Sequence, residues 1–255
     1  MRGPGGVSPE SGQPVDHTVL IGRGEAEGAD EVRLSEDEAR HLHVKRIQGG
    51  TMIRWIDGAG TSGTAVVTIR SDTEAHLRLV ERLSAPEPLP LVLGVGAGDR
   101  ERFAVLVEKA TELGVTHIYP LVTERSQNVS SRVRGEHVEK LQRRSQEAAK
   151  QSGNPWAATV HPPCGIPEFI ERTAFLQTRM MADATGHPVV MDSPEFASAI
   201  AIGPEGGFVE SERAALVEGG FAPVSFGPYM LRFETAAIAA ASICQAIRAG
   251  FEMPT

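Results

Sequence analysis

The stretch AIGPEGGFVESE, residues Ala201 to Glu212, ends a short apolar run in a proline, three glycines and one carboxylate, and a charged segment follows. An apolar run that stops at such residues and leads into a helix-prone segment is typical of a strand, loop and helix in succession. Glycine accepts positive φ and allows close approach of the backbone to a neighbour. The stretch therefore predicts either a tight turn or a loop whose backbone N–H groups receive a ligand.

A second stretch of this kind is FGPYMLRFETAAIAA, residues Phe226 to Ala240, in which Gly-Pro again ends an apolar run. Arg232 carries a fixed charge that suits a phosphate or a carbonyl oxygen. Glu234 lies where an Ala-rich helix should begin, a position that favours a carboxylate. An ion pair for Arg232 and a capping role for Glu234 are the plain alternatives. Two such loops close together in the sequence favour a shared binding site.

The last two thirds of the chain alternate strand and helix patterns, which predicts an α/β fold with a largely parallel sheet. Ligands on such sheets bind beyond the carboxyl ends of the strands. The expected strands are Leu89–Gly96, Val115–Val122, Ala158–Val160, Arg179–Ala182, Ser198–Gly203 and Pro223–Gly227. The expected helices are Arg100–Gly114, Gly135–Gly153, Glu210–Val217 and Glu234–Ala249.

The first third of the chain reads as β structure. Short segments rich in β-branched residues, Met52–Asp57, Thr64–Arg70 and Ala75–Glu81, are separated by turn signals and predict a small barrel. Before them, Ser35 followed by Glu38 forms a capping-box pattern for a short helix.

Pro and Gly mark the ends of this first region. Residues 1–16 are rich in Gly, Pro and Ser, which predicts a disordered tail rather than a secretory signal. The segment Ser84–Pro90 holds three prolines and reads as a linker. We expect one domain over residues 17–85 and a second over 86–255.

Composition and charge narrow the class of protein. The chain of 255 residues is 41% hydrophobic and 23% charged, as in an ordinary globular protein, and no apolar run approaches a membrane span. Its two cysteines, Cys164 and Cys244, have no metal-ligand spacing, so we expect no metal site and a reducing cytoplasmic location. The net charge of -8 by itself disfavours nucleic-acid binding. However, Arg40–Arg54 is basic without acids, and Arg125–Lys150 carries seven basic residues against three acids.

A third glycine-rich stretch, LVLGVGAGDR, follows a predicted strand and precedes a predicted helix. Its glycines at 94, 96 and 98 do not form G-x-G-x-x-G, because Asp99 stands at the last position. A βα turn is the favoured interpretation. A Rossmann-type methyltransferase that uses Gly94–Gly98 for its donor stays open as an alternative.

The two loops quoted first resemble the ribosomal RNA small subunit methyltransferase E family, and HLHVKR (His41–Arg46), KATELGVTHIYPLVTERSQ (Lys109–Gln127) and EAAKQS (Glu147–Ser152) extend the resemblance from about residue 35 to 245. The resemblance implies an N-terminal PUA-like barrel that binds RNA and a C-terminal α/β domain with a deep trefoil knot of the SPOUT class. It also implies S-adenosylmethionine as methyl donor, S-adenosylhomocysteine as product and a homodimer. The implied reaction is methylation of uridine N3 in the decoding region of 16S rRNA.

The resemblance also assigns site residues. Arg232 matches the family pattern, and it is our candidate for stabilising the charge that develops on a uracil oxygen or for holding a phosphate. Glu205 and Glu234 are candidate proton acceptors, with a structural role as the alternative for either. The implied donor-binding residues are Ile202, Gly203, Pro204, Gly206, Gly207, Phe226, Gly227, Met230, Leu231, Thr235 and Ala236. The expected RNA-binding residues are His41, Lys45, Arg46, Arg132, Arg134, Arg143 and Arg144.

The sequence also departs from the family pattern. Val209 replaces a Ser that could cap a helix, Tyr229 an Arg, Phe233 a Thr and Asn154 an Arg. These departures concern contacts with RNA more than the donor pocket. They leave a non-catalytic RNA-binding module as a further alternative.

Overall fold

The structure is a computed structural model that describes residues 17–96, 98–126, 136–189 and 196–250. The chain divides into two compact units, Met1–Ala85 and Pro86–Thr255. The predicted tail, residues 1–16, lies outside the described residues.

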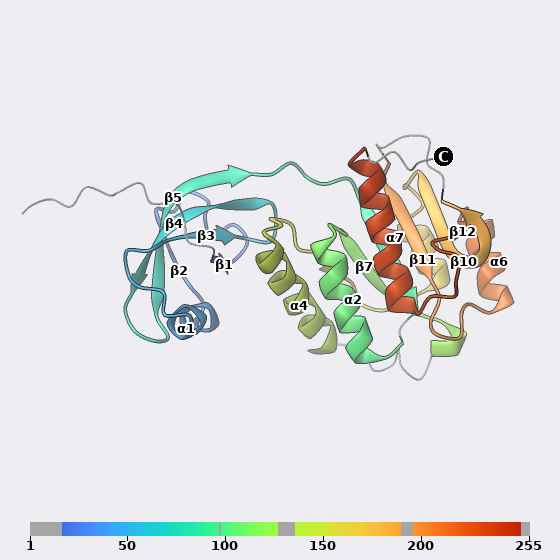
Figure 1. Ribbon diagram of the computed structural model, residues 1–255, viewed down its shortest axis with the longest axis horizontal. Helices are drawn as coiled ribbons and strands as arrows, with labels where there is room; N and C mark the ends of the chain where they lie inside the picture. Colours follow the sequence, from blue (N-terminus) through green and yellow to red (C-terminus); the bar gives the residue numbers. More distant parts are fainter. Residues whose placement is uncertain (1–16, 97, 127–135, 190–195, 251–255) are drawn as a thin grey trace, which may run out of the picture. The chain divides into compact units, whose positions relative to one another are not determined.

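The first unit is built on a five-stranded sheet in the order β1-β3-β4-β5-β2 (Figure 1). The β1–β3 pair is parallel and the other pairs are antiparallel. Trp55, Leu77 and Leu42 are fully buried in its core. Strands β1 and β2 have three residues each, which is too short for an alternating sequence pattern to predict them. The bounds are β1 Thr18–Leu20, β2 Glu31–Arg33, β3 Met52–Ile56, β4 Thr61–Ile69 and β5 Ala75–Ser84.

The helix of this unit, α1 (Glu36–Val44), has a hydrogen-bonded cap at each end. The Ser35 hydroxyl accepts from the Glu38 N–H at 3.2 Å, as the capping pattern predicts. At the other end the Ile47 N–H donates to Leu42 and the Arg46 N–H donates to His43, which is the Schellman arrangement. That motif requires a left-handed residue, and here Arg46 adopts a φ of 56° where glycine is usual.

The second unit has a sheet in the order β12-β10-β11-β6-β7-β8, with β9 also paired to β7, and all its pairings are parallel. This confirms the predicted α/β class. Sequence analysis missed β9 and the seven-residue helix α5. The strands are β6 Leu91–Gly96, β7 His117–Val122, β8 Thr159–Val160, β9 Cys164–Gly165, β10 Thr178–Pro188, β11 Ser198–Ile202 and β12 Ala222–Ser225. The helices are α2 Arg100–Glu112, α4 Glu136–Ser152, α5 Ile166–Arg172, α6 Glu210–Glu218 and α7 Phe233–Arg248, with a 3-10 turn, η1, at Glu124–Ser126.

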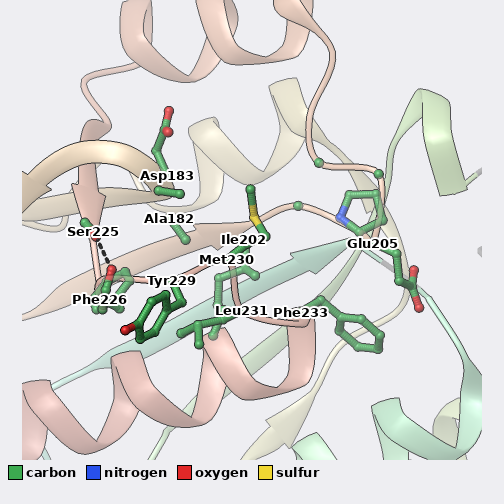
Figure 2. Close-up of a pocket in the computed structure, with 17 residues that line it drawn as sticks. Ala182, Asp183, Ile202, Glu205, Ser225, Phe226, Tyr229, Met230, Leu231 and Phe233 are labelled. Carbon is green, nitrogen blue, oxygen red and sulfur yellow. Dashed lines mark hydrogen bonds between the residues drawn. The ribbon is translucent and has the colours of Figure 1, made fainter.

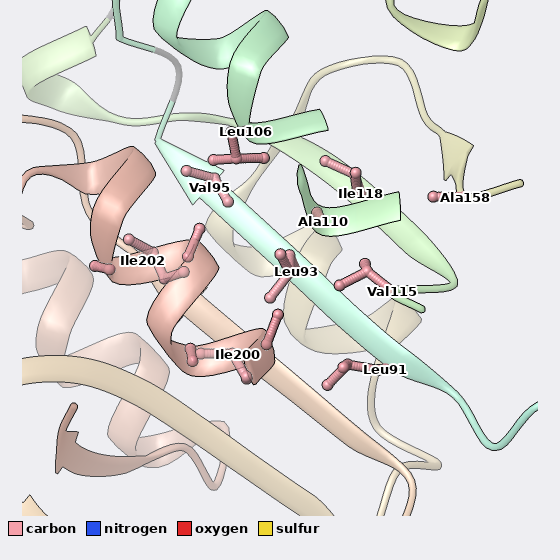
Figure 3. Packing of buried hydrophobic residues seen from close by; sticks show 14 of the residues in the cluster. Leu91, Leu93, Val95, Leu106, Ala110, Val115, Ile118, Ala158, Ile200 and Ile202 are labelled. Atoms are coloured by element: carbon pink, nitrogen blue, oxygen red, sulfur yellow. The ribbon is translucent and has the colours of Figure 1, made fainter. Parts of the chain in front are cut away.

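Helices cover both faces of this sheet. Leu91, Leu93 and Val95 of β6 pack with α2, α4 and α7 (Figure 3). Val92 belongs to the hydrophobic cluster on the opposite face, which includes residues of α5 and α6. Side chains of a strand alternate between faces, so the fully buried β6 reads as a continuous apolar run.

Helix α7 crosses back over the sheet. The chain leaves the edge strand β12 and returns as α7 to contact β6, β11 and α2. Apart from Phe233, its buried residues are small, among them Ala237 and Ala240, and they allow close packing against the sheet. The loop that makes this return lies at the carboxyl ends of the strands.

Candidate functional site

A cavity of about 250 Å³ lies beyond the carboxyl ends of β11 and β12 and beside the middle of β10 (Figure 2). It combines the loop after β11, the loop after β12, the first turn of α7 and a bend in β10. This is the edge of a parallel sheet at which ligands bind. The lining residues are Ala182, Asp183, Ala184, Ile202, Gly203, Pro204, Glu205, Gly206, Gly207, Ser225, Phe226, Gly227, Tyr229, Met230, Leu231, Phe233 and Ala236.

The loop after β11 needs its glycines for its own shape. Gly207 has a φ of +71° and donates its N–H to the Pro204 carbonyl at 2.8 Å. A Cβ on Gly203 would lie 2.9 Å from the Phe208 backbone nitrogen. The loop is therefore a tight turn, and it also forms part of a cavity wall, so the two interpretations of the opening stretch describe the same residues.

One carboxylate and one guanidinium hold this loop through three hydrogen bonds. The Glu212 carboxylate accepts from the Val209 N–H at 3.0 Å and from the Glu124 N–H at 2.8 Å. Arg125, in η1, donates to the Gly206 carbonyl. Val209 offers no capping side chain, and Glu212 supplies the hydrogen bond at that helix start instead.

The glycines of the stretch Gly94–Gly98 face protein atoms. A Cβ on Gly94 would lie 2.4 Å from the Phe169 ring, and one on Gly96 would lie 2.5 Å from Pro204. A Cβ on Gly98 would lie 2.7 Å from the Glu205 carboxylate oxygens. None of the described residues in this stretch lines the cavity. These glycines allow the β6–α2 turn to pack against the cavity loop, which argues against their use as a Rossmann-type donor loop.

The three predicted catalytic residues lie in different settings. Glu205 lines the cavity, but its carboxylate lies 3.5 Å from the Asp99 N–H at the start of α2, far from Tyr229 in Figure 2. Arg232 is exposed and is the N-cap residue of α7. Glu234 is 13% exposed and lies 3.9 Å from Arg102. Its Oε2 atom is buried and has no hydrogen-bond partner among the described residues.

All the predicted donor-binding residues except Thr235 line the cavity; Thr235 is exposed. Sequence reasoning missed Ala182–Ala184, Ser225, Tyr229 and Phe233. The Ser225 hydroxyl donates to the Gly227 carbonyl at 2.8 Å and shapes the loop after β12. No turn motif in the sequence indicates that β10 contributes to the cavity wall. The only available signal is the polar Asp183 after an apolar run.

Asp183 brings a negative charge to the cavity. Burial opposes its ionisation, but hydrogen bonds from Thr185 and the ion pair with Arg213 outweigh burial and hold the pKa of Asp183 below its usual value. The carboxylate is therefore ionised at neutral pH, and its partners fix its orientation.

The predicted RNA-binding residues are dispersed over both units. In the first unit Lys45 and Arg46 are exposed, while His41 stacks on His17 with ring centroids 5.3 Å apart. In the second unit Arg143 is exposed and Arg144 pairs with Glu108 at 2.5 Å. The other two predicted residues, Arg132 and Arg134, lie outside the described residues.

Residues 85–245 match the family of RNA methyltransferase domains, so the second unit is an RNA methyltransferase domain. A curated relative, the ribosomal RNA small subunit methyltransferase E of Synechocystis sp., is 30% identical over 215 residues, which cover 80% of this chain and 69% of the relative. The protein of the same name from Aquifex aeolicus is 29% identical over 82% of this chain and 92% of its own length. The chain belongs to the ribosomal RNA small subunit methyltransferase E family.

Solved structures resemble the chain over most of its length. The ribosomal RNA small subunit methyltransferase E of Neisseria gonorrhoeae, bound to S-adenosylmethionine, has a TM-score of 0.81 at 26% identity and covers 91% of this chain and 97% of its own. A Legionella pneumophila methyltransferase in complex with the same cofactor has a TM-score of 0.80 at 28% identity and covers 90% and 96%.

Two kinds of feature are absent from the part of the chain that the structure describes. Within it, no helix is both long and apolar enough to cross a membrane. Nor do three or more His, Cys, Asp or Glu side chains gather there in a way that could hold a metal ion.

Proposed function

We propose that this protein transfers the methyl group of S-adenosylmethionine to N3 of a uridine in the decoding region of 16S rRNA. The supporting observation is the cavity itself, because the donor-binding residues expected from the family pattern, all but Thr235, converge on it from two loops. Family membership and the relatives that bind this donor support the same function.

The lining of the cavity suits this donor. Ile202, Phe226 and Leu231 offer apolar contact to an adenine ring, and the turn over 203–207 offers backbone groups to polar atoms. The donor supplies a methyl group on a sulfonium, which is a good leaving group. The residues around it then have to hold the acceptor in line, and such positioning is worth several kcal/mol, up to about 7–11 in ideal cases.

The acceptor nitrogen needs help from charged groups, because N3 of uridine carries a proton. The C–S bond breaks with its electron pair moving to sulfur, the methyl group bonds to N3, and the N3 proton leaves. Arg232, next to the lining residues Leu231 and Phe233, stabilises the charge that develops on a uracil oxygen. Glu205 and Glu234 are the candidate proton acceptors. Glu205 lines the cavity but faces the start of α2, whereas Glu234 does not line the cavity and has a buried Oε2 atom without a hydrogen-bond partner among the described residues.

The two units divide the task in this proposal. The five-stranded first unit is the PUA-like RNA-binding domain, with the exposed Lys45 and Arg46 on RNA phosphates. The second unit, residues 86–255, is the SPOUT domain, and the return of α7 from the edge strand β12 to the middle of the sheet is consistent with a trefoil knot. Arg143 and Arg144 join the RNA contact.

A homodimer and a cytoplasmic location complete the proposal. The homodimer rests on the family resemblance alone, and sedimentation analysis of the purified protein tests it. The cytoplasmic location follows from a substrate in the small ribosomal subunit.

Mass spectrometry of 16S rRNA from cells with and without this protein tests the function. One methylated uridine should disappear when the protein is missing, and an unchanged methylation pattern would refute the proposal. Calorimetric titration with S-adenosylmethionine separates it from a non-catalytic RNA-binding module, which would give no heat. Arg232→Ala should abolish methyl transfer while donor binding stays close to that of the wild type.

A further inference from the structure

An aromatic ring stands exposed at the cavity. Tyr229 lines it and is 80% exposed, and it directly follows the Gly-Pro turn after β12 (Figure 2). Aromatic residues make up only 5% of this chain. The described residues show one other aromatic side chain of comparable exposure, Phe175 at 75%. Phe175 precedes the first residue of β10, Thr178, and is not among the residues that line the cavity.

The proposed reaction needs an aromatic ring that can stack on the uridine base. A base that is methylated on its pairing edge has to leave its stack in the RNA, at a cost in free energy. An aromatic side chain that takes the place of the lost neighbour offsets part of this cost, and it does so for any base because every base has a π face. The ring has to lie at the mouth of the donor site and remain open to the arriving base.

Tyr229 meets these requirements better than the other cavity residues do. Phe226, Leu231 and Ile202 are half-buried or buried and form the interior that suits the donor. Tyr229 is open to solvent on the rim, so a base can reach its face while the donor occupies the interior. We propose that Tyr229 is the stacking partner of the uridine that receives the methyl group, an inference that rests on the proposed function.

Tyr229→Ala and Tyr229→Phe test this inference, with Phe175→Ala as the matched loss of an exposed ring that does not line the cavity. The substrate is the small ribosomal subunit purified from cells that lack this protein, and the methyl group is followed from labelled S-adenosylmethionine. Tyr229→Ala should lower kcat/KM for the subunit by about 5- to 150-fold, the range that 1–3 kcal/mol of stacking implies. Tyr229→Phe and Phe175→Ala should behave like the wild type.

Donor affinity and oligomeric state separate stacking on the base from other roles of the ring. The Kd for S-adenosylmethionine and the sedimentation behaviour of Tyr229→Ala should match the wild type. Full activity of Tyr229→Ala would overturn the inference. So would weaker donor binding, which places the ring on the donor, or altered sedimentation, which places it between subunits. A wild-type protein that transfers no methyl group refutes the proposed function itself, a result distinct from these.

Discussion

Replacing Gly96 with alanine should damage the cavity although Gly96 does not line it. The added Cβ would lie 2.5 Å from the Pro204 ring and backbone nitrogen and 3.0 Å from the Gly203 carbonyl carbon. Ordinary contact begins at 3.4 Å, so the cavity loop has to retreat by about 0.9 Å. Both neighbours are backbone or proline atoms, which cannot rotate away. Overpacking of this kind costs about 1–3 kcal/mol.

This cost should be visible in two measurements. For a unit of this size, a loss of about 2 kcal/mol lowers the melting temperature by roughly 4–8 °C, which calorimetry resolves. The same displacement moves Gly203 and Pro204, which line the cavity, so the affinity for S-adenosylmethionine should fall about tenfold or more. Gly49→Ala is the control, because the nearest atom to its Cβ would be the Ile69 nitrogen at 3.8 Å.

The two measurements have to change together. A variant that keeps its melting temperature and its donor affinity would refute the tight contact between the two loops. A variant that loses donor affinity at an unchanged melting temperature would mean that Gly96 touches the donor directly, as a Rossmann-type loop would. The comparison therefore tests the packing and the choice of donor loop at once.

Three further predictions concern stability. Arg46→Gly should stabilise the first unit by about 1 kcal/mol in thermal unfolding, because it relieves the left-handed φ of 56°, and no gain would contradict this. Arg248→Ala should cost the second unit about 2–4 kcal/mol in denaturant unfolding, since its guanidinium donates to the carbonyls of Leu89, Pro90 and Phe196; a loss near zero would show that these bonds contribute nothing. Burial, with His117 and Arg172 nearby, lowers the pKa of His161 to about 4, so the folded state holds the ring neutral. Stability from this site is complete above pH 6.5 and declines below it; from pH 6.5 to 5 the wild type should lose about 2 kcal/mol relative to His161→Phe, and parallel pH profiles would refute this.

Most helices and strands of the second unit could be predicted from the sequence, because their apolar residues recur with a clear helical period or form continuous runs. The apolar runs at β6, β7 and β11 and the amphipathic α2 were predicted close to their observed bounds. Helix α5 was missed because its seven residues include Pro167 and span barely two turns. The short strands β1, β2 and β9 exist through pairing with distant partners, which local pattern cannot reveal.

The candidate site was predictable to the extent that it consists of loops with Gly-Pro signals. The loops after β11 and β12 could be predicted from these signals. Ala182–Ala184 could not, because they line the cavity only as a result of the strand order, in which β10 lies between β11 and β12. The interpretation of the stretch Gly94–Gly98 also depended on tertiary contacts. Its glycines are explained by Phe169, Pro204 and Glu205, which lie far away in the sequence.

The order of the strands has a consequence for synthesis of the protein. β12 and the loop that follows it come after every other strand of the second unit along the chain, yet they form one wall of the cavity. A nascent chain that stops short of Ser225 has no complete pocket, so a cellular pool of S-adenosylmethionine cannot stabilise partly made molecules. Ligand binding can therefore stabilise the folded state only of chains whose last helix has been translated.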